Sequence, residues 1–156
     1  MDFKTFERNT RDASYGVNLD KEARITKVYC DWCDKHGISY EVNPADSKMN
    51  CLGCDVTVNN GHKAYIDIKG CVSRYDTVCL TYERSYDGKN WRPVLNEHKI
   101  TSDYVFIDEL DNIYSISMHE LKEAFDSFKK TTASPDKAGH WQRVILIPKY
   151  MLHALN

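Results

Sequence analysis

The sequence predicts an α+β fold in which a central mixed β-sheet is flanked by helices. Helical periodicity is strong in two segments, residues 20–36 and 117–130, whereas alternating apolar and polar residues typical of strands fill most of the chain between them. A further strand-like run, "WQRVILIP", follows at 141–148. The order of helix, several strands, helix and strand is typical of an α+β or mixed-sheet domain.

Length and composition set the next limits. The chain has 156 residues, of which 42% are hydrophobic and 28% charged, so we expect residues 1–156 to form a single domain with one ordinary core. No run approaches eighteen apolar residues. The N-terminus "MDFKTFERNT" lacks the apolar segment of a secretory signal. We therefore expect a cytoplasmic protein of a prokaryotic or phage-infected cell, with no membrane contact.

Net charge and motifs exclude some functions. The net charge of -2 gives no overall basic field, so binding to nucleic acid would need local lysines and arginines or metal ions that offset carboxylates. No Gly-rich phosphate loop of an NTPase is present, and no Ser/His/Asp arrangement is recognisable from spacing.

The first helix is predicted from Asp20, after an arm or short helix and a turn at residues 1–19. Glycine at position 37 supplies the stop. Glu22 lies near the apolar face of this helix rather than opposite it. The apolar face is formed by residues that recur at helical intervals: Ala23, Ile25, Val28, Tyr29, Trp32 and Cys33.

A β-hairpin carries the charged residues of greatest interest. A strand at 38–42 and a polar loop at 43–50 lead to the strand-like runs "CDVTV" and "AYIDIKG", which are joined at Asn60-Gly61, a strong hairpin signal. Asp55 and Asp67 therefore lie on neighbouring antiparallel strands and can converge if the register turns them to one face. Asp67 and Lys69, two residues apart on one strand, share a face.

The rest of the chain continues the mixed pattern. Three strands are expected at 77–86, 103–110 and 112–117, with "DGKNW" as a turn after the first and "DELDN" as the hairpin loop between the other two. Ser117 and Glu120 form a capping box at the start of the second helix. We expect a loop at 131–140, the strand at 141–148 and a short helix at 149–156.

The segments "LGCDVTV" and "AYIDIKG", preceded by a helix bearing Glu22, resemble the core of the PD-(D/E)XK nuclease superfamily, whose fold is restriction-endonuclease-like. The resemblance spans residues 20–125, and "DYVFID" and "NIYSISMHELKEAF" are similar to the continuation in small phage and prokaryotic members. It matches Asp55 to the metal-binding aspartate, Asp67 to the second acid, Lys69 to the lysine and Glu22 to the helix glutamate. The sequence departs from the family at Cys54, where proline is usual, and in having aspartate rather than glutamate at Asp67.

This resemblance implies a metal-dependent endonuclease acting on DNA, with RNA as the other substrate that the sequence leaves open. Carboxylates of Asp55, Asp67 and Glu22, with the main-chain carbonyl of Ile68, would hold Mg²⁺ or Mn²⁺. Lys69 would orient the attacking water or stabilise the charge on the phosphorus centre. Small members of such folds often dimerise, so a homodimer is compatible with it. The alternative is a solvated strand face with an ordinary Asp–Lys ion pair.

Aromatic and cationic residues follow in "TYERSYDGKNWR". Such a mixture suits phosphate contacts and base stacking. It provides our candidates for contact with nucleic acid: Tyr82, Arg84, Lys89 and Arg92.

Four cysteines support a competing interpretation. Cys30 and Cys33 form one C-x2-C pair and Cys51 and Cys54 another, at a spacing that can make a tetrahedral zinc site. Such a site would suit a zinc-stabilised module that binds nucleic acid or protein without catalysis. The first pair, however, falls inside a predicted helix, so these cysteines can equally be small buried hydrophobes.

Overall fold

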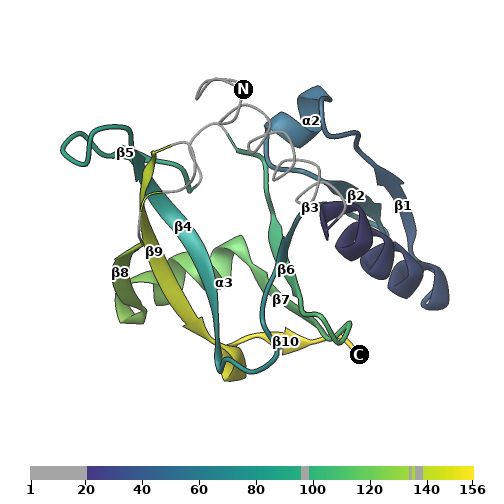
Figure 1. Ribbon diagram of the computed structural model, residues 1–156. Helices are drawn as coiled ribbons and strands as arrows, with labels where there is room; N and C mark the ends of the chain where they lie inside the picture. The colour runs from purple at the N-terminus through teal and green to yellow at the C-terminus, as the bar shows by residue number, and fades with distance from the viewer. Residues whose placement is uncertain (1–20, 96–98, 134, 136–138) are drawn as a thin grey trace, which may run out of the picture.

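The structure, a computed structural model, describes residues 21–95, 99–133, 135 and 139–156 (Figure 1). The arm predicted at 1–19 lies outside these residues. The fold is α+β with a mixed central sheet and few helices, as the sequence predicts. None of the described helices is long and apolar enough to cross a membrane.

The central sheet is six-stranded and mixed. Its strands, in spatial order, are β1 (Ser39–Val42), β2 (Val56–Asn59), β3 (Lys63–Gly70), β6 (Asp103–Ile107), β7 (Ile113–Ser117) and β10 (His153–Ala154). The pair β3 and β6 is parallel and the other neighbours are antiparallel. Parallel neighbours need a long crossover connection, because the chain must return to the same end of the sheet.

That crossover is supplied by strands of a second sheet. Its order is β5 (Arg92–Pro93), β4 (Thr77–Ser85), β9 (Trp141–Pro148) and β8 (Lys129–Ala133), all antiparallel. The chain passes through β4 and β5 between β3 and β6. The two sheets are therefore interleaved in sequence.

Both faces of the central sheet are buried, which explains the apolar run of β6. Val105 and Ile107 pack in a core with Ile25 of the helix over residues 21–35. Tyr104 and Phe106 point to the opposite face, where they pack in a second core with the second sheet and α3 (Met118–Ala124). Successive strand residues point to opposite faces, so one strand serves both cores.

Several local predictions are confirmed. Gly37, with φ of 65°, follows the first helix, and Gly61, with φ of 81°, lies in the turn between β2 and β3. Both glycines adopt the left-handed conformation that other residues rarely tolerate. Ser117 and Glu120 form the expected capping box at the start of α3.

Three predictions beyond the site are wrong. The second helix ends at Ala124, with a 3-10 turn at Phe125–Ser127, and the expected loop begins with strand β8. Phe128 is buried in the second core, which turns the chain towards β9. The expected C-terminal helix is a 3-10 turn, Lys149–Met151, followed by β10, because this segment pairs with the edge of β7. Packing outweighs local helix propensity in both places.

The predicted loop at 43–50 contains a short helix, α2 (Lys48–Cys51). The Ser47 side chain accepts a hydrogen bond from the Asn50 amide and caps the helix. A helix of four residues is too short to show periodicity in the sequence.

Candidate active site

The site forms where β3 runs beyond its neighbour. The β2–β3 ladder ends with the pair Val56 and Ile66, whereas β3 continues to Gly70. Beyond the ladder, the Ile68 amide has no partner on β2 and donates instead to Oδ2 of Asp55 at 2.7 Å. The N–H and C=O of one strand residue point to the same side. The Ile68 carbonyl therefore also faces this edge, as expected for a cation ligand.

The two predicted acids lie close together just beyond the end of the β2–β3 ladder. The Asp55 amide donates to the Ile66 carbonyl at 2.8 Å, which holds Asp55 beside the segment of β3 that carries Asp67. The Asp55 charge raises the pKa of Asp67, as expected for neighbouring carboxylates. The structure thus brings together the two carboxylates that the sequence placed on neighbouring strands.

Asp67 is the most perturbed acid of the site. Its side chain is 14% exposed, and its Oδ1 lies 3.4 Å from Nζ of Lys69. The pKa of Asp67 is raised to about 6, chiefly by burial; the Lys69 ammonium lowers it and the Asp55 charge raises it. A carboxylate on a solvated strand face would not be this buried. The Asp–Lys pair is therefore not an ordinary surface ion pair.

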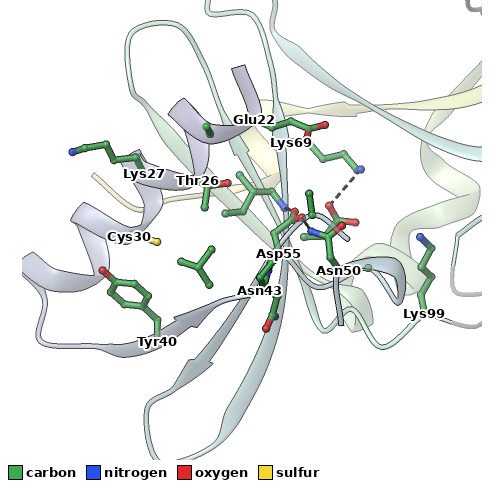
Figure 2. Close-up of a pocket in the computed structure, with 17 residues that line it drawn as sticks. Glu22, Thr26, Lys27, Cys30, Tyr40, Asn43, Asn50, Asp55, Lys69 and Lys99 are labelled. Atoms are coloured by element: carbon green, nitrogen blue, oxygen red, sulfur yellow. Dashed lines mark hydrogen bonds and ion pairs between the residues drawn. The ribbon is translucent and has the colours of Figure 1, made fainter. Parts of the chain in front are cut away.

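A cavity of about 720 Å³ opens onto these carboxylates (Figure 2). Glu22, at the first described turn of the helix, lines the cavity and is exposed. A second lysine, Lys99, lines the same cavity, and its charge lowers the pKa of Asp67. The four predicted catalytic residues, Glu22, Asp55, Asp67 and Lys69, therefore all line one cavity.

The loop after α2 holds the cavity wall in place. Asn50 donates from Nδ2 to Oδ1 of Asp55 at 2.9 Å, which fixes the second carboxylate oxygen. Gly53, with φ of 85°, accepts a hydrogen bond from the Thr101 hydroxyl at 2.7 Å. A Cβ on Gly53 would lie 2.5 Å from that hydroxyl and 2.9 Å from Cδ of Lys99. A side chain at position 53 would therefore clash with the aliphatic part of Lys99, so this position requires glycine.

The donor set suits a hard divalent cation. Each carboxylate oxygen of Asp55 carries one hydrogen bond and keeps a further lone pair. Among the described residues, no three His, Cys, Asp or Glu side chains gather as a ready-made metal cage. Two carboxylates and a carbonyl nevertheless fit Mg²⁺, which usually keeps several waters and binds one or two carboxylates.

The four residues predicted to contact nucleic acid lie on the second sheet. They do not line the cavity, and β4 and β5 lie across the molecule from α2 and β1 in Figure 1. Tyr82 packs edge-on against Phe125, with ring centroids 5.4 Å apart. Arg84 pairs across the ladder with exposed Arg92, and Lys89 is exposed in the turn between them. The structure groups these residues apart from the carboxylates.

The four cysteines of the zinc hypothesis are not gathered. Cys30, Cys33 and Cys54 are buried, Cys51 is exposed, and no cluster of three metal-ligating side chains occurs among the described residues. Burial raises the pKa of Cys30 to about 11 and also raises that of Cys33, which disfavours the thiolate that binds metal. Cys54 donates from Sγ to the Val56 carbonyl at 3.3 Å. These contacts match the packed-hydrophobe interpretation.

Sequence reasoning missed Asn50 and gave Lys99 no particular role. Asn50 follows Ser47 by three residues, which is the spacing of a helix cap and the signal that could have located α2. Lys99 reaches the cavity because the Ile100 amide donates to the Leu52 carbonyl at 2.9 Å. This contact joins segments distant in sequence, so no local pattern reveals it.

Comparisons with known proteins add little to this geometry. No protein-family model and no curated protein sequence matches the chain. Among solved structures, a nuclease from a fusselovirus is similar, with a TM-score of 0.41 and 13% sequence identity over 99% of this chain and 89% of that chain. A TM-score of 0.41 is too low to assign a shared fold.

Proposed function

We propose that this protein is a Mg²⁺- or Mn²⁺-dependent nuclease that hydrolyses phosphodiester bonds, with DNA as the first substrate to test. The observation that carries the proposal is the neighbouring, half-buried pair Asp55 and Asp67, with Lys69 beside it in an open cavity. Burying two like charges is unfavourable, so such pairs are typical of sites that bind a cation or perform catalysis.

Asp55, Asp67 and the Ile68 carbonyl would hold the cation, with Glu22 reaching it directly or through water. A bound divalent cation supplies charge that polarises a phosphate oxygen and makes a bound water more acidic. Asn50 and the Ile68 amide fix the orientation of the Asp55 carboxylate. Asp67 is mostly ionised above its pKa of about 6, and this favours cation binding near neutral pH.

The two lysines have separate tasks. Lys69, 3.4 Å from Asp67, is placed to orient the attacking water or to stabilise the charge that develops on the phosphate oxygens. Lys99 lines the cavity beside Gly53 and would hold a phosphate of the same strand. None of the described residues that line the cavity is marked as an activated nucleophile, so direct attack by water is the expected route.

The test is cleavage of supercoiled plasmid and of labelled single strands in Mg²⁺, Mn²⁺ or EDTA, with Asp67→Ala alongside. We expect metal-dependent cutting that falls by at least about 1,000-fold in the variant, because the variant loses a metal ligand. Asp46→Ala, in the exposed loop before α2, is the matched control and should cut normally. Cutting by Asp67→Ala at the wild-type rate would show that the site is wrong.

A further inference from the structure

The cavity extends well beyond the carboxylates. Its far end lies between the helix over residues 21–35 and β1, and Figure 2 shows Thr26, Cys30 and Tyr40 there, on the opposite side of the cavity from Lys69 and Lys99. The proposed chemistry uses only the charged end. The other end therefore needs a separate explanation.

The far end is mainly apolar and open; Lys27, which is paired with Asp31, also lines it. Tyr40 and Val42 are two residues apart on β1, and they share the face of their partners Val58 and Val56, which lie in the first core. Val42 is nevertheless 47% exposed, and it lines the cavity with Ala23 and Thr26 of the helix. The apolar face of the sheet thus continues into the cavity without cover.

Tyr40 is held in place at this end. Its hydroxyl donates to Oδ2 of Asp34 at 3.1 Å, which anchors the tip of the side chain. Its ring packs beside the first core while still lining the cavity. A fixed aromatic ring beside an open apolar wall is the usual form of a stacking platform for bases.

We propose that this apolar end binds an unpaired nucleobase next to the phosphate that is cut, an inference that rests on the function proposed above. Two features of the cavity favour this occupant. The apolar end is continuous with the charged end, so a strand that places its phosphate at Lys69 and Lys99 brings the neighbouring nucleoside to Tyr40 and Val42. A cavity of about 720 Å³ is also of the size that encloses one small ligand.

The consequence is a preference for nucleic acid with unpaired nucleotides at the cut. In a duplex both faces of a base are stacked and its edge is paired, so it reaches the apolar end only after it leaves the helix, at an energetic cost. Single strands, gaps and frayed ends do not require this step. The subsite thus specifies a substrate class rather than a base sequence.

The test uses Asp67→Asn, which we expect to bind nucleic acid without cutting it, and fluorescent oligonucleotides in Mg²⁺. Binding of a single strand should exceed binding of the matching duplex. Adding Val42→Ser should weaken single-strand binding by roughly 3-fold and adding Tyr40→Ala by roughly 10-fold, with duplex binding unchanged, because base stacking is lost. Val72→Ser, at a valine that is 38% exposed and does not line the cavity, is the matched control.

Abasic substitutions make the test independent of variant folding. One abasic position beside the cleavage site should weaken binding to Asp67→Asn but have no additional effect on the protein that also carries Val42→Ser. Equal losses at every abasic position, or equal effects of Val42→Ser and Val72→Ser, would overturn the subsite. Metal-dependent cleavage by the wild type with either of these results would leave the proposed nuclease standing, so the two failures are distinguishable.

Discussion

The ion pair between Arg143 and Glu83 on the second sheet joins one cation to one acid, whereas the pair at the end of β3 in the central sheet has a second acid beside it. Arg143 on β9 lies 3.4 Å from Glu83 on β4, and its guanidinium lies over the Trp91 ring at 3.9 Å from the centroid. Oδ1 of Asp67 likewise lies 3.4 Å from Nζ of Lys69. Asp67 also has the Asp55 charge beside it, and its side chain is less exposed than that of Glu83.

The contrast shows that charge on a strand does not by itself mark a functional site. Asp108 makes the same point, because it is fully buried but its carboxylate accepts hydrogen bonds from the amides of Leu110 and Asn112 and from the Asn112 side chain. Those bonds account for its burial as part of a turn. Asp67 instead has a raised pKa and lies at an open cavity, which is why we propose a functional role for it.

After the loss of Asp67, the largest expected effect concerns Lys69. Lys69→Gln removes the cation beside Asp67, so cleavage should fall by about 100- to 1,000-fold, as when a group that stabilises transition-state charge is lost. Lys63→Gln, at the exposed start of the same strand, should leave the rate unchanged. Initial rates of plasmid nicking measure both. Similar rates for the two variants would remove Lys69 from the chemistry.

The second prediction concerns stability and pH. Folding raises the pKa of Asp67 from 3.8 to about 6, so the folded chain binds this proton more tightly and loses stability as the pH rises through that range. Without metal, Asp67→Asn should therefore be more stable than the wild type near pH 7, by on the order of 2–3 kcal/mol. Near pH 3.5 the difference should vanish. Urea unfolding in EDTA measures it, and a destabilised variant at pH 7 would contradict it.

Arg92 allows the second sheet to be tested for a role in binding. Arg84 and Arg92 lie opposite each other, and buried Nε of Arg84 has no hydrogen-bond partner among the described residues. A phosphate would relieve such like-charge repulsion. Arg92→Gln should weaken binding of nucleic acid by about 2- to 5-fold at low salt, with no change in the rate at saturation. A fall in that rate would mean that the second sheet takes part in the chemistry.

The smallest effect is expected at Cys51. Its side chain is exposed, so Cys51→Ser should change the free energy of unfolding by no more than about 0.5 kcal/mol. Zinc content, measured by emission spectroscopy on purified protein, should be the same in the variant and the wild type. Stoichiometric zinc that Cys51→Ser releases would instead support the zinc-stabilised module.

The parts that local sequence patterns could predict are those that local interactions specify. The turn at Asn60-Gly61 and the alternation along β3 locate the hairpin, and these patterns suffice to bring Asp55 and Asp67 together. Glycine at 37 and the capping box at Ser117 likewise act within a few residues. These local conformations are kept in the folded protein because the tertiary contacts favour the same conformations.

The parts that were not predicted depend on distant partners. The segment at 149–156 has a helical pattern but becomes β10, because the edge of β7 offers it hydrogen bonds. Lys99 reaches the cavity because Ile100 bonds to Leu52. Asn50 reaches it because it lies in a helix of only four residues. Propensity and periodicity carry no information about such contacts.

The central claim is that the end of β3 is a cation site and the second sheet is not. Isothermal titration of Mn²⁺ near pH 7.5 into the wild type, Asp67→Asn and Glu83→Gln tests it most directly. The account predicts saturable binding to the wild type and to Glu83→Gln, and its loss in Asp67→Asn. Absence of binding to the wild type, or unchanged binding to Asp67→Asn, would contradict it.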